Sequence, residues 1–298
     1  MAPASLADSR SVPRRSAPVR LQCGRHLLDL DTPVVMGILN VTPDSFSDGG
    51  RFAGLAEALA QAERMADEGA AIIDVGGEST RPGAAPVDTE EELRRVIPVI
   101  ERLASSLAIP VSVDTRKPVV MQAAIAAGAS MVNDVTALCE PGAMEAVTDA
   151  DVAVCLMHMQ GEPRTMQLTP RYGDVVAEVR GFLRDREARC VAAGIARSRL
   201  VVDPGFGFGK TLAHNLELLR RLGEIAADGV PVLAGLSRKS LIGALTGRDN
   251  ADRLAGSVTL AAIAAHNGAR IVRAHDVGPT VDALRIAVAV DAERGQPV

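Results

Sequence analysis

Paired cysteines and metal-binding histidine motifs are both missing from this chain of 298 residues. The four cysteines lie far apart and form no Cys-x-x-Cys pair. Neither disulfide staples nor a zinc ribbon is therefore expected, and a reducing cytoplasm is the predicted location. The five histidines form no HxH or HExxH pattern, which argues against zinc-dependent hydrolysis.

Long apolar runs and an excess of positive charge are also missing. No apolar run approaches the roughly 20 residues that span a bilayer, so no membrane partner is expected. A net charge of −5 argues against wholesale nucleic-acid binding, while local cationic sites stay open. The hydrophobic share of 47% and the charged share of 23% are typical of a soluble globular protein with an ample core.

Residues 1–19 differ from the rest of the chain. The first 20 residues hold four arginines against one acid, Asp8, with three prolines and no continuous apolar stretch of the kind a secretory signal needs. An organellar transit peptide would share this composition and stays an alternative. We interpret residues 1–19 as a disordered basic tail, followed by a single domain over 20–298.

Two nucleotide-binding motifs are absent. A P-loop ending at Lys210 would need glycine where the chain has Pro204. No Rossmann unit opens the chain. We interpret the alternating glycines of 205–209 as a turn that lets the backbone approach a flat ligand, with Phe206 and Phe208 as possible walls of its pocket.

What the chain does have is a repeated alternation of short β-rich runs and alanine-rich helical patterns, in eight rounds. The expected strands are 34–39, 71–75, 110–114, 131–134, 152–157, 200–203, 231–236 and 270–273. The expected helices are 55–68, 90–105, 118–127, 142–150, 175–193, 215–227, 252–267 and 280–293, with Thr89 and Asn215 as capping residues. This pattern predicts a closed α/β barrel of the (β/α)₈ TIM type, with a doubly wound open sheet as the alternative. Residues 20–31 read as a hairpin that plugs the lower end of the barrel.

Polar groups follow every expected strand, at the end where barrel enzymes carry their active sites. The groups are Asn40, Asp74, Asp114, Asn133, His158, Asp203, Lys239 and His275. Random surface polarity would scatter over both ends of the strands. The coincidence therefore predicts one site.

The chemistry of this ring suits two kinds of group in a ligand. Asn40, Arg81, Arg273 and His275 suit an anionic, phosphorylated part. Asn40 and nearby acids are the available metal ligands, and such oxygen donors together with phosphates suit Mg²⁺. A flat heterocycle rich in hydrogen-bond donors would suit the remaining groups, which are Asp74, Asp114, Asn133, Asp203 and Lys239.

Eight segments, taken in order, resemble dihydropteroate synthase. They are MGILNVTPDSFSDGG (36–50), DVGGESTRPGA (74–84), SVDTRKP (112–118), ND (133–134), MHMQGEPRTMQ (157–167), DPGFGFGK (203–210), GLSRKS (235–240) and HDV (275–277). The resemblance implies a cytoplasmic (β/α)₈ homodimer of folate biosynthesis, in a class of enzyme that sulfonamides target. Its small-molecule substrates would be 6-hydroxymethyl-7,8-dihydropterin diphosphate and 4-aminobenzoate, joined with release of pyrophosphate and with Mg²⁺ as cofactor.

The resemblance also implies roles for individual residues. Pterin binding falls to Asp74, Asp114, Asn133, Met157, Asp203, Phe208, Gly235 and Lys239. Diphosphate binding falls to Asn40, Arg273 and His275, with Asn40 also a Mg²⁺ ligand. The aminobenzoate cleft and its loops hold Phe46, Thr80, Arg81, Pro82 and Ser237. The residues expected to act in catalysis are Asp114, Asn40, Arg273, His275 and Lys239.

Departure of the diphosphate would leave a cation conjugated with the dihydropterin, which the arylamine attacks. Asp114 would stabilise the cation, while Mg²⁺, Arg273 and His275 would stabilise the leaving group. No dedicated general base is expected. Two alternatives stay open, a pterin-binding barrel that transfers a methyl group to a corrinoid protein and a non-catalytic paralogue that binds pterin. The intact loops 40–50 and 76–83 argue against both.

Overall fold

The computed structural model describes residues 18–41, 51–78, 86–162 and 165–293, without the side chains of 51–53 and 293. Residues 1–17 of the expected tail therefore lie outside the described residues, as do 42–50 and 79–85, which carry Phe46, Thr80, Arg81 and Pro82.

Eight parallel strands close into a barrel in the order β10-β3-β4-β5-β6-β7-β8-β9. The strands are β3 (Val34–Asn40), β4 (Ala70–Gly76), β5 (Val111–Asp114), β6 (Met131–Asp134), β7 (Ala153–Met157), β8 (Leu200–Asp203), β9 (Val232–Ala234) and β10 (Ala269–Ala274). Their residues are buried on both faces, which is why the sequence shows apolar runs instead of alternation. The closed sheet confirms the expected barrel, and the open-sheet alternative is wrong.

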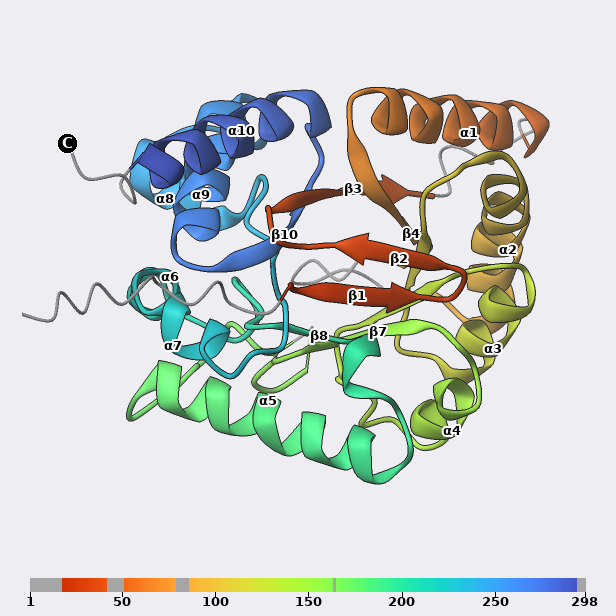
Figure 1. Ribbon diagram of the computed structural model, residues 1–298, viewed down its shortest axis with the longest axis horizontal. Coiled ribbons are helices and arrows are strands. Elements are labelled where there is room, and N and C mark those ends of the chain that lie inside the picture. The colour runs from red at the N-terminus through yellow and green to blue at the C-terminus, as the bar shows by residue number, and fades with distance from the viewer. Residues whose placement is uncertain (1–17, 42–50, 79–85, 163–164, 294–298) are drawn as a thin grey trace, which may run out of the picture.

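A hairpin closes one end of the barrel, as expected. Its strands, β1 (Arg20–Cys23) and β2 (His26–Asp29), pair antiparallel and lie across the barrel in Figure 1. Leu21 and Leu30 are fully buried and form one apolar cluster with Met36 and Met131 of the barrel interior. The hairpin therefore seals the interior at the strand N-termini and leaves the opposite rim for the site.

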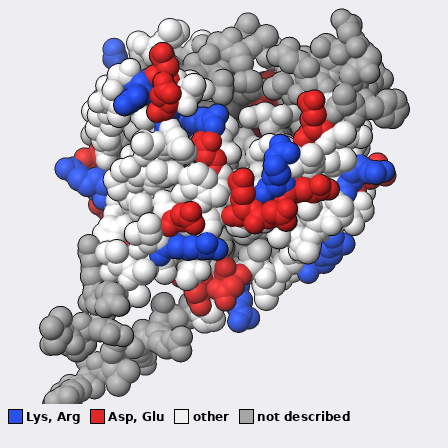
Figure 2. Space-filling view, turned by 90° about the horizontal axis from the view of Figure 1, so that it is seen from above, with Lys and Arg blue, Asp and Glu red and all other residues white. Residues whose placement is uncertain are grey.

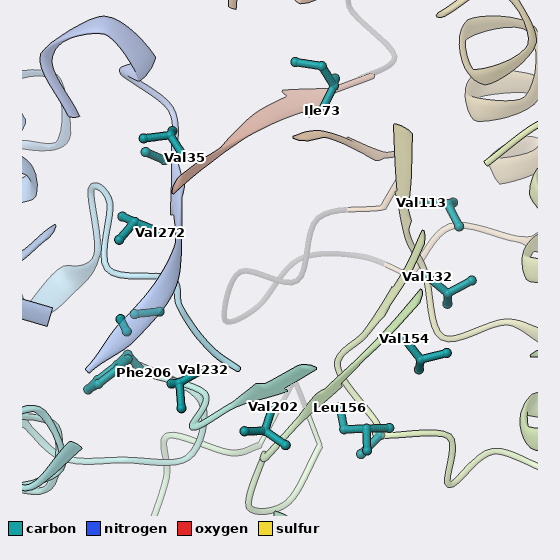
Figure 3. Close-up of a cluster of buried hydrophobic side chains, with 14 of the residues drawn as sticks. Val35, Ile73, Val113, Val132, Val154, Leu156, Val202, Phe206, Val232 and Val272 are labelled. Carbon is teal, nitrogen blue, oxygen red and sulfur yellow. The ribbon is translucent and has the colours of Figure 1, made fainter. Parts of the chain in front are cut away.

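Helices surround the strands and cover a second, larger apolar layer. They are α1 (Arg51–Asp67), α2 (Thr89–Ser106), α3 (Pro118–Ala126), α4 (Ala143–Thr148), α5 (Val175–Ala192), α6 (Leu212–Arg220), α7 (Leu222–Ala226), α8 (Ser240–Thr246), α9 (Leu254–His266) and α10 (Val277–Glu293). Figure 3 shows side chains such as Val35, Val132 and Val202 pointing from the strands away from the barrel axis. The layer between strands and helices is mainly aliphatic, and Phe206 is also buried in it.

Three local expectations were wrong. Asp88, not Thr89, caps α2, because its Oδ1 accepts the Glu91 N–H at 2.8 Å. The expected helix 215–227 is two helices that meet at Arg221, and α6 begins earlier because Thr211 caps it. The segment of α8 was not expected to be helical.

Charged side chains of both signs alternate over the flank of the molecule in Figure 2, with no broad patch of one sign among the described residues seen there. No helix in the described part of the chain has the length and hydropathy that crossing a bilayer requires.

Candidate active site at the barrel rim

A cavity of 440 Å³ opens at the C-terminal ends of the strands. Eleven residues that the sequence assigned to the site border it: Asn40, Asp114, Asn133, Met157, Asp203, Phe208, Gly235, Ser237, Lys239, Arg273 and His275. Asp74 is fully buried and reaches the cavity through Asn133 and Arg273. Phe46, Thr80, Arg81 and Pro82 fall outside the described residues.

Arg273 lies between two carboxylates at the floor of the cavity. Its Nε donates to Asp74 Oδ2 at 2.6 Å, and its Nη2 donates to Asp114 Oδ2 at 2.7 Å. Asn133 Nδ2 donates to the same Asp74 oxygen at 3.0 Å. The four side chains come from β4, β5, β6 and β10, so the closure of the barrel is what joins them.

Burial and charge oppose each other in this cluster. Burial alone would lower the pKa of the Arg273 guanidinium, but the Asp74 and Asp114 carboxylates outweigh it and hold that pKa above its ordinary value. Burial raises the pKa of the Asp114 carboxyl to about 7, although the Arg273 charge opposes the shift. Burial therefore destabilises the Asp114 anion, and the Arg273 charge partly offsets this.

Asp203 ends β8 and is anchored by the backbone that follows it. Its Oδ1 accepts the Gly205 N–H at 2.7 Å, and its Oδ2 faces Gly235, whose Cβ, if present, would lie 3.9 Å away. Burial raises the pKa of Asp203, while the Gly205 hydrogen bond and the nearby Lys239 charge oppose that rise. A carboxylate fixed in this way can accept hydrogen bonds from a flat donor edge.

The glycine-rich run folds as a tight turn that brings an aromatic wall to the cavity. Gly205 has φ +70°, and a Cβ there would overlap the carbonyl oxygen of His158 at the end of β7. The Lys239 ammonium lies 4.1 Å from the centre of the Phe208 ring. Phe206 also borders the cavity, but its side chain is packed in the apolar layer behind the strands.

Ser237 and His275 lie side by side across β9 and β10. Ser237 Oγ is 3.0 Å from His275 Nδ1 and accepts the His275 backbone N–H at 3.2 Å. The next residues along each loop form a two-pronged ion pair, because Arg238 donates to both carboxylate oxygens of Asp276 at 3.0 and 2.5 Å. Ser237, assigned from the sequence to aminobenzoate, thus contacts a residue assigned to the diphosphate.

Several residues at the cavity were missed by sequence reasoning. Ser240 begins α8, and its signal was its place directly after Lys239 in the GLSRKS segment. Glu78 borders the cavity while its carboxylate accepts from Lys117 at 2.5 Å, and it lies within the GGEST segment. Arg253 also borders the cavity and carried no signal in the sequence.

Oxygen donors near Asn40 are suited to a hard cation. Asn40 Oδ1 and Asp114 Oδ2 each lie 3.8 Å from the point where a Cβ at Gly76 would stand, so both flank the end of β4. The described residues hold no group of three His, Cys, Asp or Glu side chains able to bind a metal by themselves. The donor set fits Mg²⁺, which keeps waters and takes substrate phosphates as ligands.

Known proteins resemble this chain over nearly its whole length. A family model described as pterin binding enzyme matches residues 36–275. Dihydropteroate synthase of Escherichia coli K12 is 55% identical over 262 residues, covering 88% of this chain and 93% of the relative. The structure of Xanthomonas albilineans dihydropteroate synthase with 4-aminobenzoic acid superposes with a TM-score of 0.86 at 55% identity, covering 94% and 100% of the two chains. The Burkholderia cenocepacia enzyme complexed with 7,8-dihydropteroate gives a TM-score of 0.85 at 50% identity, covering 94% and 99%.

Proposed function

The chain belongs to the pterin-binding enzymes and, within them, to the dihydropteroate synthases, and from this premise we propose how its rim cavity works. The protein is a transferase that condenses 6-hydroxymethyl-7,8-dihydropterin diphosphate with 4-aminobenzoate, giving 7,8-dihydropteroate and pyrophosphate. The observation that carries this function is the meeting of Asp114, Asn133, Asp203, Lys239 and His275 around one cavity.

The pterin is held on the side of the cavity where Asp203 lies. Asp203 accepts from the amino and ring N–H groups of the pterin, Asn133 and Lys239 contact the rest of its polar edge, and Phe208 lies against its face. The support is the acceptor geometry of Asp203 and the position of the Lys239 ammonium over the Phe208 ring. Asp74 supports Asn133 from below, while Met157 and Gly235 line the pocket.

The diphosphate is held on the side where β3 and β10 end. Asn40, Arg273 and His275 are its ligands. Arg273 already donates through Nε and Nη2 to two carboxylates, so Nη1 is the atom assigned to the diphosphate. Ser237 Oγ contacts the His275 ring at 3.0 Å and aligns it, and its role near the aminobenzoate stays a prediction.

Mg²⁺ would be held by Asn40 Oδ1 together with diphosphate oxygens and water, and when bound it neutralises charge on the leaving diphosphate. Phe46, Thr80, Arg81 and Pro82 stay predictions for the aminobenzoate cleft.

The reaction then follows from how charge develops. The bond between the pterin methylene carbon and the diphosphate oxygen breaks, and the electron pair leaves with the oxygen. Arg273 and His275 stabilise the negative charge that grows on the diphosphate, and the Asp114 carboxylate stabilises the cation that remains. The aminobenzoate nitrogen gives its lone pair to that cation, and the nitrogen loses its proton to water afterwards. No general base is needed, because an arylamine attacks such a cation as the neutral amine.

The direct test is pyrophosphate release from the two substrates, with and without Mg²⁺. We expect release that requires both substrates and falls by roughly 10²–10³ when Asp114→Asn removes the stabilising charge. Asp151→Asn is the matched control, since Asp151 is exposed and distant from the cavity. If pyrophosphate is not released in a Mg²⁺-dependent way, the remaining functions are a corrinoid methyltransferase and a non-catalytic pterin-binding protein.

The chain also forms a homodimer in this proposal, through the outer face of α9 and α10. Four large apolar side chains are exposed there, Leu254, Ile263, Ile286 and Val290, and a groove runs between the two helices. In sedimentation, Ile286→Lys should shift the protein towards monomer, while Val191→Lys on α5 should leave it dimeric. A cytoplasmic location is proposed as well, because all four cysteines are free thiols.

A further inference from the structure

Lysine is scarce in this protein, and its few lysines gather at the rim. Of the 32 basic residues only three are lysine, namely Lys117, Lys210 and Lys239. Each lysine lies in a segment that follows a barrel strand, namely β5, β8 or β9, and all other basic residues are arginine. An ammonium group is compact and can direct three donors to acceptors that converge on one point, whereas a guanidinium is a flat fork. The three positions are therefore places to ask whether a compact ammonium is required.

The proposed function gives no role to Lys117 or Lys210, and of these two only Lys210 is buried. Its side chain is 3% exposed, so it does not act as a surface charge. Its Nζ donates to the carbonyl oxygens of Gly205 at 2.9 Å and Phe208 at 3.0 Å. It also lies 3.4 Å from the carbonyl oxygen and 3.0 Å from the Nδ1 of His158. The ammonium thus joins the turn after β8 to the end of β7.

The acceptors around Lys210 are fixed in position and uncharged. The His158 ring packs edge-on against Phe182 with 5.0 Å between ring centres. Burial and the Lys210 charge lower the pKa of His158 to about 3, so its ring is neutral and Nδ1 can accept. Burial lowers the pKa of Lys210 to about 7, although the Asp203 charge opposes that shift. Burying the Lys210 amino group is costly, and its hydrogen bonds to the Gly205 and Phe208 carbonyls offset that cost.

The turn that Lys210 ties down carries two groups of the pterin pocket. Asp203 stands at its start and accepts the Gly205 N–H, and Phe208 stands near its end beneath Lys239. Within this turn, Lys210 donates to the carbonyls of Gly205 and Phe208. Releasing those carbonyls would let the turn relax, and the spacing between Asp203 and Phe208 would change with it.

We propose that Lys210 is a positioning residue for pterin binding, whose ammonium fixes the turn of residues 205–208 against β7 and so sets the spacing of Asp203 and Phe208. This inference rests on the proposed function, because it takes those two residues as pterin contacts. Lys210 itself touches no substrate. Its effect reaches the reaction through the turn.

The test compares Lys210→Met and Lys210→Arg with a matched control. Lys210→Met keeps the apolar stem and removes the donors, and Lys210→Arg keeps the charge but replaces the compact ammonium. The control is Arg199→Met, because Arg199 is also a buried cation whose donors hold the Val147 and Val152 carbonyls, at the opposite end of the barrel. The readouts are the affinity for 6-hydroxymethyl-7,8-dihydropterin by calorimetry, the KM for each substrate, and the urea midpoint of unfolding.

We expect both Lys210 variants to bind the dihydropterin roughly tenfold more weakly, the size of effect that one to two lost hydrogen bonds produce. The KM for 4-aminobenzoate at saturating dihydropterin diphosphate should stay within about twofold of the wild type, since the turn carries the pterin contacts. Arg199→Met should lower the urea midpoint and leave both KM values unchanged.

Wild-type affinity in Lys210→Arg would overturn the inference, because the compact ammonium would then be dispensable. Equal loss of affinity in Arg199→Met would overturn it too, since any buried cation would have the same effect. If Lys210→Met does not fold, Lys210→Arg decides alone. The calorimetry needs no turnover, so a wild type that binds dihydropterin without releasing pyrophosphate would refute the proposed function and leave the Lys210 comparison intact.

Discussion

Substituting Gly205 by alanine should damage the pterin pocket far more than the same change at another left-handed glycine. Gly205 has φ +70° and Gly229, in the turn before β9 at the hairpin end of the barrel, has φ +79°. Alanine in the left-handed backbone region costs roughly 1–2 kcal/mol of stability at either position. At Gly229 the nearest atom to the new Cβ would be 3.7 Å away, on a flexible arginine, so no further cost arises. Gly229→Ala therefore measures the free-energy cost of the backbone conformation alone.

At Gly205 the new methyl would overlap the His158 carbonyl oxygen and lie 3.0 Å from the carbonyl carbon. Both atoms are backbone, so the turn must move away from β7 by roughly 1 Å, a displacement that can cost about 10²-fold in a positioned site. We expect Gly205→Ala to lower kcat/KM for the dihydropterin diphosphate by about that factor, and Gly229→Ala to leave it unchanged.

The assay is pyrophosphate release, with urea unfolding of both variants as the stability measurement. Equal kcat/KM values for Gly205→Ala and Gly229→Ala would refute the reasoning, because the close approach of the turn to β7 would then have no bearing on the site.

Three further predictions follow from the same structure. Turnover should fall as the pH drops through about 7, because the raised pKa of Asp114 means that its carboxylate is protonated there. Arg273→Met should move this acid limb to higher pH, because it removes the cation that opposes the rise in the pKa of Asp114. A pH–rate profile measures the position of the limb. Leu30→Ala in the barrel plug should cost about 2–5 kcal/mol of unfolding free energy in urea and leave both KM values unchanged.

The barrel and the location of its site were predictable because they depend on local patterns. Buried parallel strands read as short apolar runs, and β3 and β8 were placed to within one residue for this reason. A polar residue at the end of such a run is visible in the sequence, as Asp114 and Asp203 show. The closure of the barrel then joins them without any further information.

The partners within the site were not predictable in the same way. Arg273 reaches Asp74 and Asp114 over 199 and 159 positions, and no feature of the sequence indicates which carboxylate it meets. The helix α8 has seven residues and was missed, although the six-residue α4 was expected. It is held by tertiary contact, where Ile242 packs so close to Gly256 of α9 that no Cβ would fit there.

The sequence predicted helix N-caps of the right residue type at the wrong positions. Asp88 and Thr89 are both good caps, and only the backbone conformation decides which side chain reaches the free N–H groups. Asn215 was expected to begin a helix, but its side chain instead accepts the Gly207 N–H at 2.7 Å and supports the glycine turn. Asn215 therefore stabilises the glycine turn next to the site and is not a helix N-cap.

The central claim is that one rim cavity holds the pterin against Asp203 and the diphosphate against His275. A crystal structure with 6-hydroxymethyl-7,8-dihydropterin diphosphate and no aminobenzoate measures this directly. We expect the amino edge of the ring within hydrogen-bond distance of Asp203 and the diphosphate beside His275 and Asn40. A ligand bound outside the cavity, or one turned so that its diphosphate meets Asp203, would contradict the claim.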